Sequence, residues 1–248
     1  MRIGLQIFPD FPTVRKSVSM KRLGMHRISI SLAKNRWKIC NYWQKKYRRS
    51  GLRKRRTWRK RTLRCVNPGS RLCRWRMHLI LRHIANPPYG LYVKGCLPQG
   101  ETVAIVGARM CSEYGRTVAR ELGRMLAARG VGVVSGMARG IDAAGHQGAL
   151  DVGGISCAVL GCGVDVCYPK SSRALYEEIL ERGSVVSEYP PGTQPIPGYF
   201  PQRNRIISGL VRAVVVVEAK QRSGSLITAD FALEQGRDVY AIPGRITD

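Results

Sequence analysis

The chain has 248 residues, and its 42 Lys and Arg against 16 Asp and Glu give it a formal charge of +26 at pH 7. It has no apolar run of the roughly 18 residues that a membrane helix needs and no apolar segment of signal-peptide type, which argues against a membrane or secreted protein. The eight cysteines lack the spacing of a zinc site, so we expect free thiols, a cytoplasmic location, and neither a metal nor another cofactor.

The positive charge is concentrated in the N-terminal third. Residues 1–90 hold 25 Lys and Arg against one acid, Asp10, and so carry +24, whereas residues 91–248 carry only +2. All four Trp also lie in the first third. This break in composition predicts a basic, poorly ordered segment over residues 1–85 and a folded domain over residues 86–248.

Residues 45–64 are the most basic part of the N-terminal segment, and Tyr47 and Trp58 lie among the charges. Three interpretations stay open. The segment is a nucleic-acid-binding arm, since cations neutralise phosphates and aromatic rings stack on bases. Alternatively it is disordered and attaches by charge alone, or it is not a native domain and derives from a truncation or a reading-frame error. No site is assigned here.

From residue 102 onward, short β-branched runs alternate with helical patterns. The expected strands are 102–107, 131–136, 155–163, 184–190, 213–219 and 238–244. The expected helices are 112–130, 138–153, 171–183, one that starts near Gln202, and 225–237. Strands that are apolar on both faces, each followed by a helix, predict a doubly wound, mostly parallel sheet of the extended Rossmann-like α/β class.

The carboxyl ends of parallel strands lie along one edge of a sheet, so the polar loops that follow them are expected to meet there. Gly107 and Arg109 follow the first strand, where glycine permits close approach of a ligand and arginine supplies a forked donor. Ser135 and Gly136 open the second loop, at a helix N-terminus that favours an anion.

Asp142 lies in the first turn of the next helix and is expected to stabilise that turn. His146 follows four residues later on the same helical face. The pair could serve acid–base chemistry, but no Ser or Cys nucleophile is placed with it. We therefore favour a structural hydrogen bond.

Further phosphate-binding candidates come from the later loops. Lys170 leaves the third strand, and Ser223 opens the last helix. Arg203, Asn204 and Arg205 lie in the sequence FPQRNRIISGL, where Pro201 suggests an irregular segment that points both arginines the same way. Glu218, at the end of a strand, is expected to orient one of these arginines or to accept a sugar hydroxyl. With no Walker lysine in the chain, this set is suited to hold phosphates without cleaving them.

These motifs carry a family resemblance. VAIVGAR, SGMARGID, AVLGCGVDVCYP, SEYPPG, FPQRNRIISGL and the segment from VVVVEA to YAIPG, preceded by PPYGLYVKG, resemble in order and spacing the DNA-processing protein A (DprA/Smf) family. The resemblance covers about residues 86–244. It implies a non-catalytic protein that binds single-stranded DNA in natural transformation and recombination, loads the RecA recombinase and forms a homodimer. Its implied strand-binding set is Arg109, Ser135, Gly136, Lys170, Arg203, Asn204 and Arg205.

Two departures from the family pattern bear on function. The usual helical N-terminal domain is not recognisable in residues 1–85, and the chain is expected to be C-terminally incomplete, since it stops where relatives continue. Two alternatives remain. One is a nucleotide phosphoribohydrolase of the related lysine-decarboxylase-like (LOG) group, although the loop after Glu218 lacks that group's PGGxGTxxE arrangement. The other is a non-functional fragment that adsorbs by charge.

Overall fold

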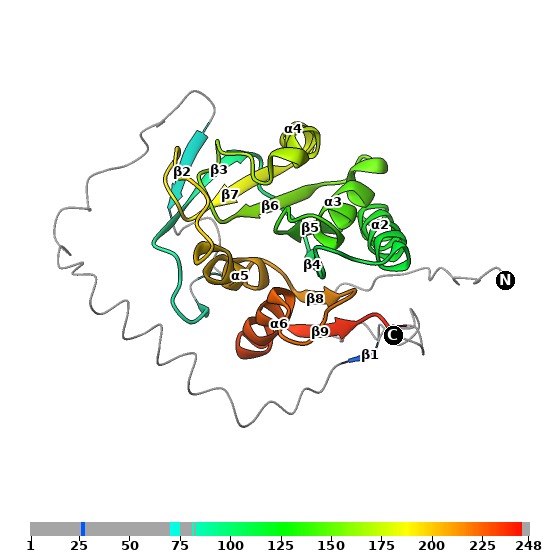
Figure 1. Ribbon diagram of the computed structural model, residues 1–248. Coiled ribbons are helices and arrows are strands. Elements are labelled where there is room, and N and C mark those ends of the chain that lie inside the picture. Colours follow the sequence, from blue (N-terminus) through cyan, green and yellow to red (C-terminus); the bar gives the residue numbers. More distant parts are fainter. Residues whose placement is uncertain (1–25, 28–69, 75–80, 82, 245–248) are drawn as a thin grey trace.

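The structure is a computed structural model that describes residues 26–27, 70–74, 81 and 83–244 (Figure 1). These residues form a sheet of nine strands in the order β1-β9-β8-β4-β5-β6-β7-β3-β2. The strands are β1 (His26–Arg27), β2 (Ser70–Arg74), β3 (Gly90–Gly95), β4 (Thr102–Val106), β5 (Gly132–Ser135), β6 (Ser156–Leu160), β7 (Ser184–Ser187), β8 (Ala213–Val216) and β9 (Asp238–Ala241).

The central six strands, from β9 through β8, β4, β5 and β6 to β7, are all parallel. They are the six strands expected from the sequence, so the predicted α/β class with a doubly wound, mostly parallel sheet is confirmed. All residues of β4, β5, β6, β7 and β8 are buried. Strands that are covered on both faces need apolar side chains on both, which explains their continuous Val-rich runs.

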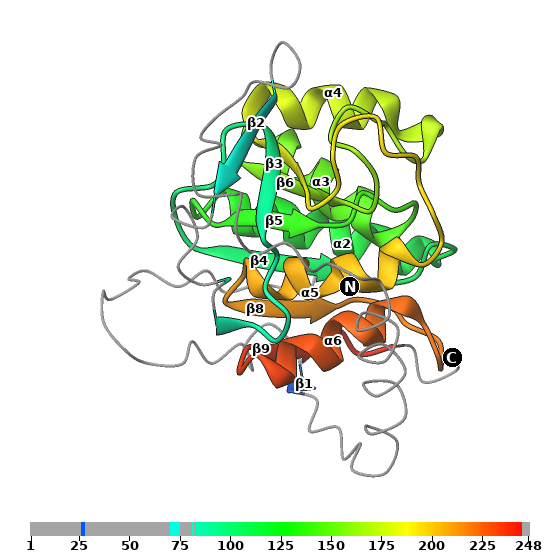
Figure 2. The same ribbon diagram turned by 90° about the vertical axis from the view of Figure 1, so that its left-hand side faces the viewer.

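The helices are α2 (Glu113–Ala127), α3 (Ile141–Asp151), the short 3-10 helix η5 (Lys170–Ser172), α4 (Arg173–Arg182), α5 (Tyr199–Gly209) and α6 (Gly224–Glu234). Figures 1 and 2 show α2, α3 and α4 on one face of the sheet and α5 and α6 on the other. Ser112 caps α2, as expected, because its side chain accepts a hydrogen bond from the Gly115 amide at 3.0 Å.

The core extends to the N-terminal side of residue 86, where the sequence placed the start of the folded domain. Leu81 and Ile84 are buried in the same cluster as Ile206 of α5. β3 and β2 add two antiparallel strands beside β7, and β1 pairs with β9. The basic sequence 45–64 lies outside the described residues.

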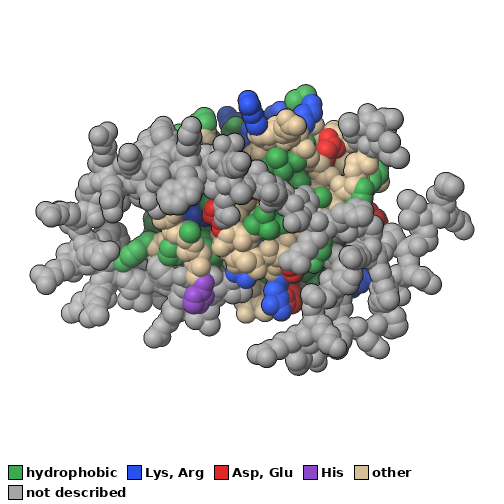
Figure 3. Space-filling model, turned by 90° about the horizontal axis from the view of Figure 1, so that it is seen from below, with side chains coloured by type: hydrophobic (Ala, Val, Ile, Leu, Met, Phe, Trp, Pro, Cys, Tyr) green, Lys and Arg blue, Asp and Glu red, His purple; other side chains and the backbone are tan. Residues whose placement is uncertain are grey.

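One face of the described part carries mixed charge. Figure 3, seen from below the view of Figure 1, shows Lys and Arg side chains next to Asp and Glu among apolar and uncharged groups. This mixture accords with the near-neutral charge of residues 91–248. Within the described ranges no helix is both long enough and apolar enough to span a bilayer.

Candidate functional site

The loops after β4 and β5 are in contact at the carboxyl edge of the sheet. The Ile141 amide donates to the Ala108 oxygen at 3.2 Å. Gly140 has a φ of 77°, and a Cβ there would lie 2.3 Å from the Ala108 oxygen and 2.6 Å from the Arg109 oxygen, so only glycine allows this contact. The packing places Arg109 on a loop next to that of Arg139, and both arginines are exposed.

A single aromatic ring, that of Phe200 in the first turn of α5, connects three segments. The guanidinium carbons of Arg109 and Arg203 each lie 5.9 Å from its centroid. The ring of Tyr168, from the loop after β6, has its centroid 5.4 Å away. We call Arg109, Tyr168, Phe200 and Arg203 the Phe200 cluster. Its cations and rings are the two kinds of group that hold a single nucleic-acid strand.

Within the Phe200 cluster, Arg203 is bound by the protein itself and is only 5% exposed. Its Nη1 donates to the Gly136 oxygen at 3.0 Å and also to the Val159 oxygen. Burial lowers the pKa of Arg203 to about 10, and the nearby carboxylate of Asp142 opposes that shift. Arg203 therefore holds α5 against the ends of β5 and β6. Its guanidinium group also lies over the ring of Phe200 and so belongs to the Phe200 cluster.

Asp142 is buried near Arg203, and the charge of each side chain affects the pKa of the other. Its Oδ2 accepts hydrogen bonds from the Gly136 amide at 3.1 Å and the Ala138 amide at 3.4 Å, so it stabilises the turn before α3, as expected. Burial raises the pKa of this carboxyl group, whereas the charge of Arg203 and the two amides act in the opposite direction.

Asn204 and Arg205 bind other parts of the protein. Asn204 Nδ2 donates to the Gly224 oxygen at 3.1 Å, and Arg205 Nη2 donates to both carboxylate oxygens of Glu188 at 2.8 and 2.7 Å. The prediction of an irregular segment here is wrong, because Arg203 and Arg205 both lie in α5. Pro201 is tolerated in the first helical turn, where its missing amide proton costs no bond. The two arginines consequently point to different partners.

Three other expected site residues shape the edge from inside. The Ser135 hydroxyl is buried and donates to the Ile105 oxygen at 2.6 Å. A Cβ on Gly107 would lie 2.6 Å from Cγ1 of Ile141, and one on Gly136 would lie 2.6 Å from Nη2 of Arg203. Both glycines are thus required by close packing inside the protein.

Lys170 follows β6 and Ser223 follows β8, so β4 and β5 lie between these two loops in the sheet. Lys170 is exposed at the start of η5, two residues after Tyr168 of the Phe200 cluster. Ser223 caps α6, since its Oγ accepts a bond from the Ser225 amide at 3.4 Å. Gly224, the next residue, accepts the bond from Asn204 that joins α6 to α5.

Of the two roles expected for Glu218, that of orienting an arginine is wrong, because the described partner of its carboxylate is Ser112. Its carboxylate accepts hydrogen bonds from the Ser112 amide at 3.0 and 3.2 Å and from the Ser112 hydroxyl at 2.9 Å. It therefore occupies the N-terminus of α2, where the helix dipole favours a negative charge. This position lies between β4 and β8, where the strand order reverses and where open α/β sheets usually bind ligands.

The structural role favoured for His146 is confirmed, but its partner is Ser156 and not Asp142. The ring Nδ1 lies 2.6 Å from Ser156 Oγ, and burial lowers the pKa of His146 to about 3. The ring stays neutral and inside the protein. In the described part of the chain, no group of three or more His, Cys, Asp or Glu could hold a metal ion.

The aromatic residues of the site were not identified from the sequence. Besides Tyr168 and Phe200, Tyr189 stacks on Tyr199 with ring centroids 4.0 Å apart. A signal was present, because aromatic residues stand at both ends of the Pro-rich loop 190–198. Arg139 was also left out, although it lies in the loop that was chosen.

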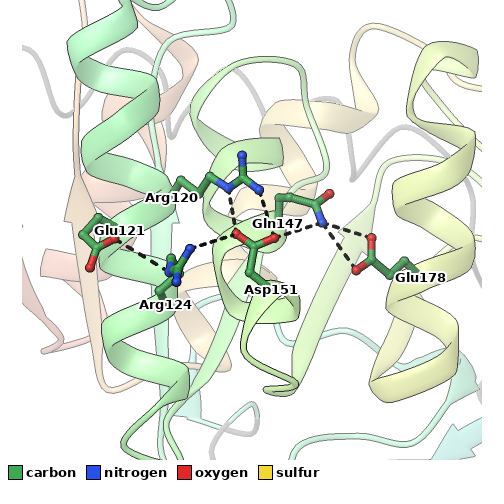
Figure 4. Close-up of polar contacts among 6 residues, drawn as sticks. All are labelled: Arg120, Glu121, Arg124, Gln147, Asp151 and Glu178. Atoms are coloured by element: carbon green, nitrogen blue, oxygen red, sulfur yellow. Dashed lines mark hydrogen bonds and ion pairs between the residues drawn. The ribbon is translucent and has the colours of Figure 1, made fainter.

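Away from this edge, the arginines of α2 are paired with acids (Figure 4). Arg120 contacts Asp151 of α3 at 2.7 and 3.0 Å, and Arg124 lies 3.9 Å from the same carboxylate. The hydrogen bond from Arg120 is the main cause of the lowered pKa of Asp151. Gln147 extends the network to Glu178 of α4 at 3.1 Å. This face joins α2, α3 and α4 and is not a second cationic site.

Comparisons with known proteins agree with the geometry. The family model of DNA recombination-mediator protein A matches residues 75–248. DNA processing protein DprA of Streptococcus pneumoniae is 49% identical over 170 residues, which are 68% of this chain and 60% of that protein. Protein Smf of Escherichia coli is 49% identical over 162 residues, which are 64% of this chain and 43% of that protein. The chain thus spans about half the length of the curated relatives it matches.

Two solved structures are similar to the fold. That of DprA from Streptococcus pneumoniae has a TM-score of 0.66 and 47% identity, and the match covers 69% of this chain and 61% of that one. That of DNA processing protein A from Helicobacter pylori has a TM-score of 0.66 and 28% identity, and the match covers 72% of this chain and 83% of that one. The Helicobacter pylori structure is described for its single-stranded DNA binding mode.

Proposed function

The chain belongs to the DNA recombination-mediator protein A family, and on that premise we propose that it binds single-stranded DNA at the Phe200 cluster. The observation that carries the proposal is the gathering of Arg109, Tyr168 and Arg203 around one ring from separate segments. Bases stack on aromatic rings whatever their sequence, and the exposed Arg109 beside the ring attracts the backbone phosphates.

Within this site we propose a division of labour. The exposed cations Arg109, Arg139 and Lys170 contact phosphates, and Tyr168 and Phe200 receive bases. The residues bound inside the protein hold these groups in place: Gly107, Ser135, Gly136, Arg203, Asn204, Arg205 and Ser223. The hydrogen-bond partners of these residues support this division. Arg205, for example, forms an ion pair with Glu188.

We propose binding without turnover. The one Asp–His pair of the site is separated, because His146 bonds to Ser156 while Asp142 bonds to loop amides. Burial raises the pKa of Cys162, the thiol at the end of β6, to about 11, so this thiol is not a ready nucleophile. Release of free adenine from AMP by the purified chain would contradict this part of the proposal.

The wider role proposed is DNA processing in transformation and recombination, with delivery of the strand to RecA recombinase and action as a homodimer in the cytoplasm. The family to which the chain belongs supports this role, and the free thiols of the described residues suit a cytoplasmic location. Recovery of RecA on strands coated by the chain, and sedimentation of the chain alone, test the two partners.

Replacement of Phe200 by Leu tests the site directly. Loss of the ring removes a stacking surface worth about 1–3 kcal/mol per base, so the affinity for a labelled oligothymidylate should fall about 5- to 150-fold in fluorescence anisotropy. Phe231→Leu, on α6, is the matched control and should bind as the unmodified chain does. Equal affinities of both variants, or equal affinity for a duplex of the same length, would argue against the Phe200 cluster as the binding site.

A further inference from the structure

A cavity of about 510 Å³ opens at the amino edge of the sheet, opposite the edge that carries the Phe200 cluster. Its apolar lining includes Leu97, Val134, Leu210 and Val211, all buried in the core cluster on the α5 side of the sheet. A cavity of this size matches those that take small organic ligands, which combine an apolar lining with a few polar groups.

Two arginines supply the charge at this cavity. Arg212 directly precedes β8 and Arg237 directly precedes β9, so the two lie at the amino ends of neighbouring parallel strands. Nε of Arg212 is 2.7 Å from Oε2 of Glu101, in a pair whose side chains are largely exposed. Nε of Arg237 is buried and has no hydrogen-bond partner.

An unpaired buried guanidinium N–H is costly, and an anion would relieve that cost. Burial lowers the pKa of Arg237, and the positive charge of Arg212 adds to the effect. Arg212 is paired with Glu101, so an anion would compete with that carboxylate for Arg212. Glu101 is the one acid among the lining residues. Cys157 also lines the cavity, but burial raises its thiol pKa to about 11, so it carries no charge at neutral pH.

We propose that this cavity binds a small organic anion with an apolar body. The anionic group is held by Arg237 and, in competition with Glu101, by Arg212, while the body covers Leu97 and Leu210. The site is independent of single-stranded DNA binding: strands of four or five residues separate the two edges by about 13–17 Å. Failure of one proposal therefore leaves the other standing.

Hydrogen–deuterium exchange of the full chain, resolved by peptide, tests the proposal. The probe is phenyl phosphate, which joins a dianion to an apolar ring, and benzyl alcohol is its neutral counterpart. Phenyl phosphate should slow exchange in the peptides around residues 97–102 and 210–213, and benzyl alcohol should not. Because exchange is read locally, adsorption of the probe to the basic N-terminal third does not count as binding.

Variants then identify the donor. Arg237→Gln should weaken the protection by phenyl phosphate about tenfold or more, as loss of a charged hydrogen bond does. Arg129→Gln removes an exposed arginine elsewhere and should change nothing. Glu101→Gln frees Arg212 and should strengthen the protection, which keeps the test decisive if Arg237→Gln fails to fold. The proposal is overturned if phenyl phosphate does not protect the unmodified chain, or if benzyl alcohol protects it equally. It is also overturned if neither Arg237→Gln nor Glu101→Gln changes the protection.

Discussion

The guanidinium group of Arg203 donates to the main-chain oxygen of Gly136 at 3.0 Å, and this bond joins α5 to the end of β5. The contact is close enough that residue 136 has no room for a side chain. A Cβ there would lie 2.6 Å from Nη2 of Arg203 and 2.7 Å from Oδ2 of Asp142. The position of Arg203 in the Phe200 cluster thus depends on the absence of a side chain at residue 136.

Replacement of Gly136 by Ala should lower the free energy of unfolding by about 1–3 kcal/mol, the usual cost of overpacking a well-filled interior. Urea denaturation of the full chain measures the change. Gly100→Ala is the control, because a Cβ at residue 100 meets no atom within 4 Å. Equal midpoints for the two variants would show that the contact between residues 136 and 203 is looser than described.

Removal of the Arg203 charge should destabilise the fold through Asp142. Arg203→Met removes the nearby positive charge that favours the Asp142 carboxylate and leaves the Gly136 and Val159 oxygens without their donor, at a cost of about 1–3 kcal/mol. Asp142→Asn in the same background should recover part of that loss. A double variant no more stable than Arg203→Met would contradict this electrostatic influence of Arg203 on Asp142.

The pH dependence of Arg203→Met has a defined sign. Burial raises the pKa of Asp142 above its unfolded value of about 3.9, so the folded variant holds a proton that the unfolded chain has lost. The contribution of Asp142 to the stability of the variant should therefore be greatest below about pH 4 and should be lost as the pH rises through the folded pKa. The Asp142→Asn double variant should lose this dependence.

His146 should contribute to acid unfolding of the unmodified chain. Its folded pKa of about 3 lies below the unfolded value of about 6.5, so between these values only the unfolded chain takes up the proton. Stability is therefore lost as the pH falls from about 6.5 toward 3, by up to about 1.4 kcal/mol per pH unit. His146→Gln should flatten this loss, and His83→Gln, at an exposed position, should not. Parallel stability–pH curves for the unmodified chain and His146→Gln would refute the assignment.

Sequence reasoning predicted the sheet and the edge, because both follow from the chain's local pattern. Six strands that are apolar on both faces can only be buried between helices, and parallel strands bring their following loops to one edge. The partner of each polar side chain could not be predicted in this way. Glu218 binds Ser112, and Arg205 binds Glu188, across 106 and 17 residues of chain respectively. Such contacts depend on which helices pack together.

The aromatic part of the site was missed for a related reason. Phe200 precedes the helix that was expected to start near Gln202, but it lies in the first turn of α5, where its ring meets Arg109 and Tyr168. A ring is assigned to a core or to a surface only once its neighbours are known. The cationic residues could be identified from the sequence because a charge is evident without a fold. A stacking surface is not evident until the neighbours of the ring are known.

The salt dependence of single-stranded DNA binding tests the central claim. Each phosphate neutralised on a single strand contributes about 0.7 to the slope of log affinity against log salt. Replacement of Arg109, Arg139 and Lys170 by Ala in one variant should therefore flatten the slope by about 2. The basic N-terminal third contributes equally to both chains, so it cancels in the difference.

The matched control removes the same charge elsewhere, by replacement of the exposed Arg124, Arg129 and Arg182 with Ala. Fluorescence anisotropy titrations of one labelled oligothymidylate across a salt series give all three slopes. We expect a slope flatter by about 2 for the variant that lacks Arg109, Arg139 and Lys170 and an unchanged slope for the control. Equal slopes for the two triple variants would place the strand elsewhere and contradict the account.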